Sequence, residues 1–242
     1  LTTSGYPRIA KLWKRGTPLS AATAVMSVDP KTVGVNLFAP SDATTRYPVI
    51  SVSKTYWDSD YFLVGPGGKL DRVPLPEGAT YQDVIGGRLI AKLQKPYKRL
   101  PEGAIVSYAI ADIRVGKSPE PQLVIAPTRT QAIEEVNATD NVLWVKLLEN
   151  VSGKLVALTP AARGGWTQRA VALPVNSTIK LVGGDGKHDM AFATVEGMLT
   201  PPRLYAVPIK GRARIIQQLP PKFEATKFAV AQRFARSKDG TR

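Results

Sequence analysis

Residues 141–174 read NVLWVKLLENVSGKLVALTPAARGGWTQRAVALP and contain three short β-like runs in a row. The first run is apolar except at Lys146, which is typical of a strand that packs on both faces. Residues 149–153 then supply turn chemistry, because Asn and Ser bond their own backbone and Gly accepts a positive φ. Pro174 ends the unit, since proline has no N–H to donate to a strand ladder. Strands are predicted over residues 142–148, 154–159 and 166–173.

The same order of β-like runs and breakers recurs along the chain at an even step. Five prolines that mark this step lie 46 to 51 residues apart, namely Pro30, Pro76, Pro127, Pro174 and Pro220. Several short strands in a period of roughly 40–50 residues are the pattern of a β-propeller blade. The sequence therefore predicts an all-β fold, a β-propeller with four complete four-stranded blades and a partial one.

The prolines also divide the chain into expected units. We expect a partial blade over residues 1–29, four blades over 30–76, 77–127, 128–174 and 175–220, and a linker over 221–242. Two strands fit into the first unit, so the chain is expected to begin within a blade. The strands of the complete blades include one over 49–57 and one over 105–113, and residues 95–102 are expected to form a surface loop. No segment has the 3.6-residue period of a long amphipathic helix.

Composition limits the chemistry that the chain can perform. Hydrophobic residues make up 43%, enough to fill a core, and the 20 Gly and 20 Pro fit a fold with many turns. The chain has no cysteine, which excludes disulfides, cysteine-ligated zinc and thiol catalysis. No apolar run approaches the ~18 residues of a membrane-spanning helix, and the N-terminus lacks a signal pattern. We therefore expect no membrane partner.

The net charge of +14 raises nucleic acid as a partner. Most basic residues, however, stand singly at predicted strand edges and turns. The densest basic region is the C-terminal tail, with Lys222, Lys227, Arg233, Arg236, Lys238 and Arg242. Aromatic residues do not alternate with the basic groups, and no nucleic-acid motif is present. We interpret the charge as a solvated surface and expect no nucleic-acid partner.

Both ends of the chain resemble one enzyme family. Residues 4–19, SGYPRIAKLWKRGTPL, resemble a run inside bacterial prolyl oligopeptidases, and residues 223–242 are similar to that family's passage out of its propeller. The resemblance spans the whole chain and implies a serine peptidase, a prolyl endopeptidase that cleaves short peptides after proline. It also implies a seven-bladed propeller, joined to a C-terminal α/β-hydrolase domain, that restricts the entry of large substrates. By this resemblance the chain is the later part of the propeller. The compartment stays open between bacterial periplasm and cytoplasm.

The residues for such catalysis are not found in this chain. Acyl transfer by this route needs a nucleophilic Ser on a sharp turn, a His base and an orienting carboxylate. No G-x-S-x-G occurs, and the one histidine is His188. It lies in residues 183–189, GGDGKHD, which predict a β-hairpin turn. We therefore assign no catalytic residue, no cofactor and no metal site, and interpret His188 as a turn residue.

Weaker signals have structural interpretations. Residues 116–118, GKS, end like a phosphate-binding loop, but Ala111 stands where the first glycine of that motif belongs, so we predict a loop. Residues 65–69, GPGGK, lack the motif's Ser or Thr and are predicted to form a turn. Two acidic pairs without a nearby histidine are interpreted as solvated edges, Asp58 with Asp60 and Glu134 with Glu135. The tryptophans are interpreted as coming from different blades and as packing between blades rather than stacking on a ligand: Trp13, Trp57, Trp144 and Trp166.

Two function hypotheses remain. In the first, the chain is the substrate-gating propeller portion of a prolyl oligopeptidase-like serine peptidase and is inactive alone. Its partners would then be the α/β-hydrolase catalytic domain and short proline-containing peptides. In the second, it is a stand-alone β-propeller module whose loops hold a partner protein. We also expect the isolated chain to self-associate through uncovered sheet faces. Closure into a smaller ring, or residues 223–236 folding back as a cover, are the alternatives.

Overall fold

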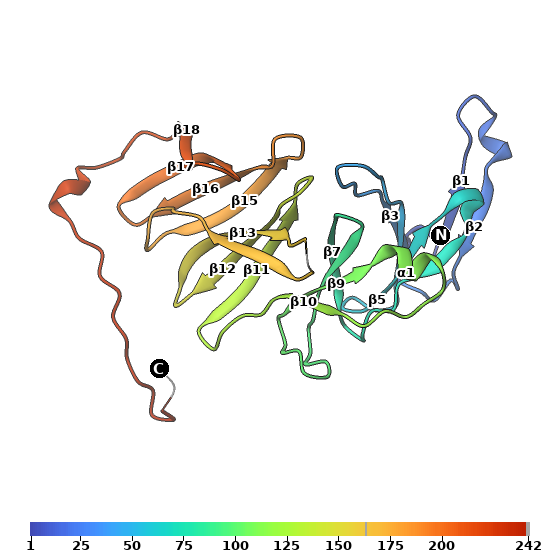
Figure 1. The fold of residues 1–242 in the computed structure, drawn as a ribbon, viewed down its shortest axis with the longest axis horizontal. Coiled ribbons are helices and arrows are strands. Elements are labelled where there is room, and N and C mark those ends of the chain that lie inside the picture. Colours follow the sequence, from blue (N-terminus) through green and yellow to red (C-terminus); the bar gives the residue numbers. More distant parts are fainter. Residues whose placement is uncertain (163, 241–242) are drawn as a thin grey trace.

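The computed structural model describes residues 1–162 and 164–240, and its described part consists of antiparallel sheets placed side by side (Figure 1). A two-stranded sheet contains β1 (Ile9–Leu12) and β2 (Thr23–Ser27). Four four-stranded sheets follow in chain order. The first contains β3 (Gly34–Phe38), β4 (Val49–Ser53), β5 (Ser59–Val64) and β6 (Leu70–Arg72), and the second contains β7 (Thr80–Ile85), β8 (Arg88–Lys92), β9 (Ile105–Ala109) and β10 (Gln122–Ile125). The third contains β11 (Gln131–Ala138), β12 (Leu143–Glu149), β13 (Ser152–Pro160) and β14 (Trp166–Ala170), and the fourth contains β15 (Thr178–Asp185), β16 (Met190–Gly197), β17 (Thr200–Pro208) and β18 (Arg214–Gln218). In each sheet the strands follow chain order, so the predicted all-β meanders are confirmed.

The helical segments are short: α1 (Ile110–Arg114), η1 (Leu19–Ala21), η2 (Pro66–Gly68) and η3 (Ala225–Lys227). The single strand predicted over 105–113 is wrong beyond Ala109, where α1 replaces it. Ile110 and Ile113 lie about one helical turn apart, and both are buried. None of the described helices is long and apolar enough to cross a membrane.

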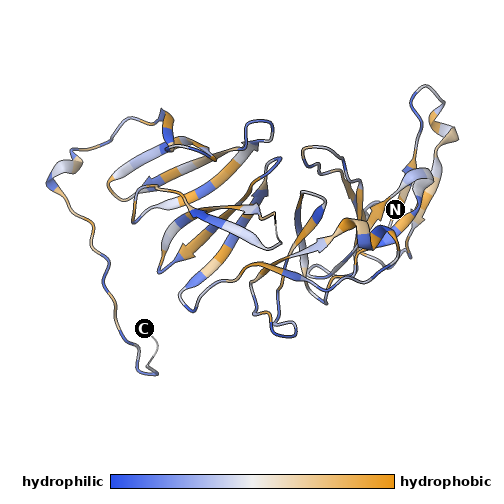
Figure 2. Cartoon of the chain, in the orientation of Figure 1, coloured by the Kyte–Doolittle hydropathy of each residue, from blue (hydrophilic) through white to orange (hydrophobic). Residues whose placement is uncertain are grey.

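Each hydrophobic cluster lies between two neighbouring sheets. Residues of β4 and β8, for example, meet in one cluster around Leu63 and Leu89, and residues of β12 and β16 meet in another around Trp144 and Ala193. Apolar and polar residues alternate along many of the strands, as Figure 2 shows, because successive side chains point to opposite faces of a sheet. The sheets therefore stabilise one another face to face, as expected of propeller blades.

The first strands of the sheets lie close together. β11 contacts both β7 and β15, and β3 contacts β1. The two-stranded sheet and the β15–β18 sheet lie at opposite ends of the molecule (Figure 1). The chain therefore does not bend into the smaller closed ring that the sequence left as an alternative.

Carboxylates join neighbouring sheets at their first strands. Asp83 Oδ2 in β7 accepts a hydrogen bond from Ala138 N in β11 (2.7 Å), and Glu135 Oε2 in β11 accepts one from Leu181 N in β15 (2.7 Å). Burial raises the pKa of Asp83, although the N–H groups of Ala138 and Val84 act in the opposite direction. A hydrogen bond to a charged group contributes about 1.5–3 kcal/mol, so these contacts fix how the sheets sit on one another.

Candidate functional site

The connections between strands lie on two sides of the molecule. Because each sheet is a meander, its connections alternate between the two ends of the strands. In neighbouring sheets the connections between the first and second strands lie on the same side of the molecule. Gly87 N in the β7–β8 turn, for example, donates to Asp42 Oδ2 in the β3–β4 connection (2.8 Å). Asp140 N in the β11–β12 turn likewise donates to Gly186 O in the β15–β16 turn (3.4 Å). The other side carries the β4–β5, β8–β9, β12–β13 and β16–β17 turns, the connections between sheets and the segment after β18. We call it the tail side.

The tail side exposes large apolar side chains. Five of them, at turns or connections, are 79% to 85% exposed: Tyr56, Trp57, Val151, Val175 and Met198. On the opposite side, Val115 is the large apolar side chain most exposed in the described turns of the four-stranded sheets, beside polar residues such as Lys117, Lys187, His188, Lys210 and Arg212. The β1–β2 connection on that side also exposes Leu19 and half of Trp13. Exposed apolar groups gathered on one face mark an interaction surface. The tail side is therefore the candidate functional site.

The β12–β13 turn on this side has an unusual backbone. Asn150 and Val151 both have positive φ, 46° and 60°. A two-residue hairpin turn of this kind normally uses Asn-Gly, because a β-branched residue is disfavoured at positive φ. Ser152 Oγ accepts a hydrogen bond from Asn176 N (3.1 Å), which ties this turn to the connection before β15. Strained backbone persists where its surroundings fix it and concentrates at functional surfaces.

The C-terminal segment runs along the tail side. Gln232 Nε2 donates to Asn150 O (2.6 Å), and Val230 shares a small cavity with Val151 and Met198. The tail therefore does not cover the outer face of the β15–β18 sheet (Figure 1), so the alternative in which residues 223–236 fold back as a cover is wrong. Arg242, which belongs to the basic group predicted for the tail, lies outside the described residues.

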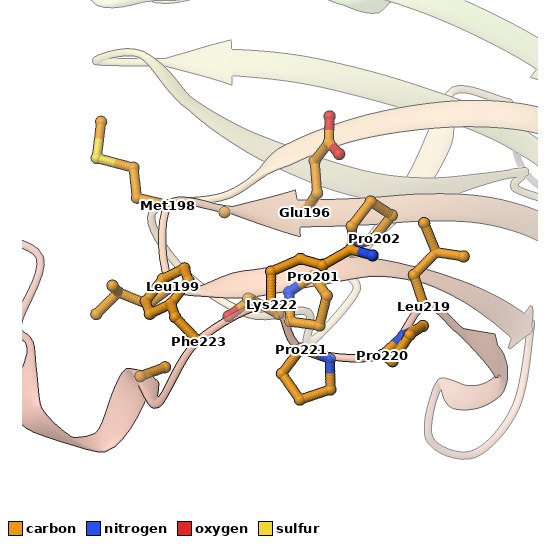
Figure 3. A pocket seen from close by; sticks show the side chains of 13 residues that line it. Glu196, Met198, Leu199, Pro201, Pro202, Leu219, Pro220, Pro221, Lys222 and Phe223 are labelled. Carbon is orange, nitrogen blue, oxygen red and sulfur yellow. The ribbon is translucent and has the colours of Figure 1, made fainter.

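A second cavity lies between the β16–β17 turn and the start of the C-terminal segment that follows β18 (Figure 3). Its wall contains two proline pairs and apolar neighbours: Pro201, Pro202, Pro220, Pro221, Leu199, Leu219 and Phe223. Prolines have no N–H, so this wall offers carbonyl groups and apolar surface but few backbone donors. Glu196 and Lys222 are the charged residues among its lining. The cavity suits an apolar side chain better than an anion.

His188 lies on the opposite side, in the four-residue turn between β15 and β16. Its Nδ1 is 2.7 Å from Asp185 Oδ2, and the side chain is exposed. The hydrogen bond from His188 lowers the pKa of Asp185. The predicted hairpin turn is confirmed, and the tail-side residues lie at the other ends of the strands.

The loop and turn predictions are also confirmed. Residues 95–102 form a loop of mostly exposed residues, and residues 116–118 follow α1 as a loop in which Lys117 Nζ bonds Asp112 Oδ1 (3.0 Å). Residues 65–69 form a turn around η2, where Gly67 has a φ of 65°.

The acidic pairs differ from each other. Asp58 and Asp60 both pair with Lys54, at 2.8 and 3.3 Å, beside solvent. Glu134 in β11 pairs with Lys146, a buried lysine in β12. Glu135 is not a solvated edge, because it bonds the next sheet, and its partner 46 positions away was not visible in the local sequence. Among residues 1–162 and 164–240, no group of three or more His, Asp or Glu side chains is placed to hold a metal ion.

The tryptophans divide into two kinds. Trp144 is buried in the cluster between the third and fourth four-stranded sheets, with its Nε1 donating to Thr139 Oγ1 (3.1 Å), and Trp166 packs against the preceding cluster. These two belong to one sheet, so the prediction that all four come from different blades is wrong. Trp57 is exposed beyond the end of β4, which stops at Ser53 rather than at residue 57. The prediction of packing between blades is therefore wrong for Trp57 and for Trp13, because both side chains are exposed.

Residues 4–218 match a family model described as the prolyl oligopeptidase N-terminal β-propeller domain. An uncharacterized peptidase of Sinorhizobium fredii is 29% identical over 261 residues, covering 100% of this chain and 35% of the relative. An uncharacterized peptidase of Rickettsia prowazekii is 23% identical over 254 residues, with the same coverage. The chain thus spans about a third of the length of these curated relatives.

Solved structures give the same fold. A post-proline cleaving enzyme of Rickettsia typhi superposes with a TM-score of 0.83 at 20% identity, over 99% of this chain and 36% of that one. Oligopeptidase B of Trypanosoma brucei superposes with a TM-score of 0.69 at 16% identity, over 98% and 35%. Together with the family match, these structures show that the sheets form a propeller-like domain.

Proposed function

Because the chain belongs to the prolyl oligopeptidase family, as part of its N-terminal β-propeller domain, we propose that it is the substrate-gating portion of a serine peptidase that cleaves short peptides after proline. The observation that carries this proposal is the family match over residues 4–218. An α/β-hydrolase domain of the parent protein would supply the Ser, His and Asp. The sheets would be four blades, over 30–76, 77–127, 128–174 and 175–220, and part of another in a seven-bladed ring. In this role the chain limits, by substrate size, which peptides reach the active site of the catalytic domain.

We further propose that the tail side faces the catalytic domain. Its exposed apolar turns suit burial against a second domain, whereas the turns of the four-stranded sheets on the opposite side are mostly polar and suit solvent. The segment after β18, which resembles the family's passage out of the propeller, begins on this side. Tail-side residues would then border the space that a substrate peptide enters.

The test compares the protein encoded by the whole gene with the 242-residue chain. We expect the whole protein to cleave a short chromogenic peptide after proline, to be blocked by a serine-directed covalent inhibitor, and to spare the same sequence inside a folded protein. The 242-residue chain should show no cleavage above background. Cleavage by this chain that the inhibitor abolishes would reveal a nucleophile here and contradict the proposal.

The apolar tail side also supports the alternative of a stand-alone protein-binding module. The two functions differ in one simple observation. A reading frame that continues beyond residue 242 into a domain with G-x-S-x-G supports the peptidase, and a stop codon at that point supports the module.

A further inference from the structure

The connection between β1 and β2, residues 13–22, projects from the end of the molecule that holds the two-stranded sheet (Figure 1). It leaves two large apolar side chains in water, because Trp13 is 46% exposed and Leu19 is 76% exposed. Both lie outside the strands, so their exposure is a property of the connection and not of an uncovered sheet face. The connection lies opposite the tail side, and it stays accessible when the tail side meets a second domain.

The same connection carries positive charge that nothing nearby neutralises. Residues 1–28 contain four basic residues and no Asp or Glu. Lys14 and Arg15 are exposed and form no ion pair with any residue that the structure describes. In the adjacent turn around η2, by contrast, Lys69 pairs with Asp71 (3.0 Å). The connection therefore combines exposed apolar side chains with unpaired cations.

Hydrogen bonds within the connection order its tip. Trp13 Nε1 donates to Thr17 O (3.0 Å), and the backbone N and Oγ1 of Thr17 donate to Lys14 O (3.2 and 2.6 Å). Gly16 has a φ of 86°, as a type II turn requires at its third residue. Because the indole N–H already has a partner in the chain, the ring can enter an apolar medium without losing a hydrogen bond.

This combination selects the surface of an anionic lipid bilayer as the partner. Anionic headgroups attract Lys and Arg, and Trp and Leu side chains are buried between the headgroups and the acyl chains. A projecting tip can make this contact alone, whereas a stable protein–protein interface buries roughly 800 Å² on each partner. Single-stranded nucleic acid stacks successive bases on several aromatic rings, and the tip offers one ring.

We propose that residues 13–19 bind the surface of an anionic lipid bilayer. Trp13 and Leu19 would enter the region between headgroups and acyl chains, and Lys14 and Arg15 would contact lipid phosphates. The sequence-based expectation of no membrane partner rests on spanning segments and signal patterns, which a peripheral contact does not need. The inference is independent of the proposed peptidase function.

The test is flotation of the 242-residue chain with vesicles through a density gradient, in which self-associated protein sinks and is not counted. We expect flotation with vesicles of phosphatidylglycerol and phosphatidylcholine in equal parts, weakened by added salt, and none with phosphatidylcholine alone. Lys14→Glu combined with Arg15→Glu should need at least tenfold more lipid for half-maximal flotation. Lys187→Glu combined with Lys210→Glu makes the same charge change in two other turns of this side and should float like wild type. Circular dichroism confirms that each variant is folded.

A second readout tests whether the apolar side chains enter the bilayer. Brominated acyl chains should quench the fluorescence of the wild-type chain, and Trp13→Phe should lose most of this quenching while still floating. Leu19→Ser should need at least threefold more lipid than wild type. Val115→Ser, which changes an exposed apolar side chain in another turn of this side, should leave flotation unchanged.

No flotation with anionic vesicles, or equal flotation with neutral ones, would overturn the proposal. An equal loss in the Lys187 and Lys210 variant would assign binding to net charge and not to this connection. Release by millimolar inorganic phosphate would identify a free-phosphate site instead, and tighter binding of single-stranded DNA, lost in the Lys14 and Arg15 variant, would identify a nucleic-acid surface. The protein encoded by the whole gene should float as well, and its failure to do so would overturn the proposal by showing that another part covers the connection.

Discussion

Asp83 and Glu135 occupy equivalent places in two neighbouring sheets. Each follows an irregularity in the pairing of a first strand, between Tyr81 and Asp83 in β7 and between Ile133 and Glu135 in β11. A β-bulge at such a point turns a side chain out of the regular alternation. The carboxylate can then leave its own sheet and accept an N–H of the next one.

We expect Asp83→Ala to lower the free energy of unfolding by about 1–3 kcal/mol, because the Ala138 and Val84 N–H groups lose their acceptor. Urea denaturation measures the change. Glu102→Ala, which removes an exposed loop carboxylate, is the control and should stay within about 0.5 kcal/mol of wild type. An equally small effect of Asp83→Ala would show that the inter-sheet bond does not stabilise the fold.

Asp42 is a second carboxylate that bonds a neighbouring sheet, and its contribution to the free energy of unfolding should depend on pH. Burial disfavours its charge, but the N–H groups of Thr44, Gly87 and Thr45 outweigh this and lower the pKa of Asp42 from 3.8 to about 2. A depressed folded-state pKa gives stability that is present above the unfolded value and lost as the pH falls toward the folded value. We therefore expect Asp42→Asn to destabilise the chain at pH 6 and to differ less from wild type as the pH drops from 4 to 2. Urea midpoints at several pH values measure this, and a difference that does not depend on pH would contradict it.

Among the elements, the β12–β13 turn holds strain that glycine would relieve. A non-glycine residue in the left-handed region costs roughly 1–2 kcal/mol. We expect Val151→Gly to raise the free energy of unfolding by about 1 kcal/mol, measured by urea denaturation. Val175→Gly is the matched control, since Val175 is equally exposed but lacks a positive φ, and it should bring no gain. No gain from Val151→Gly would contradict the assignment of backbone strain to Val151.

The element α1 shows where local sequence stops being informative. Residues 105–113 alternate well enough to predict one strand, and β9 confirms its first part. The helix depends on contacts with another sheet: Arg114 Nη1 bonds Asp71 Oδ2 (3.0 Å), and its Nη2 bonds Val64 O (3.0 Å). These partners are 43 and 50 positions away, so no local pattern contains them.

The candidate site was less predictable than the fold. Strand alternation depends on local residues, and the step between the five prolines can be read directly along the chain, so together they predict the meanders. The tail side exists because turns from four sheets meet on one face, which no single segment encodes. Residues 49–57 are largely apolar or β-branched and therefore predict one strand that includes Trp57, which the structure places in a turn. The local signal for an exposed turn is Thr55, whose Oγ1 accepts hydrogen bonds from the N–H groups of Trp57 and Asp58.

At the scale of the whole molecule, each of the two end sheets packs against a neighbouring sheet on one face only, within the residues that the structure describes (Figure 1). On the β15–β18 sheet, Val182, Ile215 and Ile216 are exposed, and β18 has an unpaired edge. At the other end, Ile9 and Leu12 of the two-stranded sheet are exposed. Neither ring closure nor the tail covers these surfaces (Figure 1).

Burying such apolar area contributes roughly 25 cal/mol per Å², and open strand edges favour pairing, so we expect the isolated chain to self-associate. Its weight-average sedimentation coefficient should rise across a hundredfold concentration range. Ile216→Lys, which places a charge beside the open edge, should move this rise to at least tenfold higher concentration. Val115→Lys, in the loop after α1, should leave it unchanged. A compact monomer at every concentration would contradict the expectation, and it would require these exposed faces to be too small or too well hydrated to bind one another.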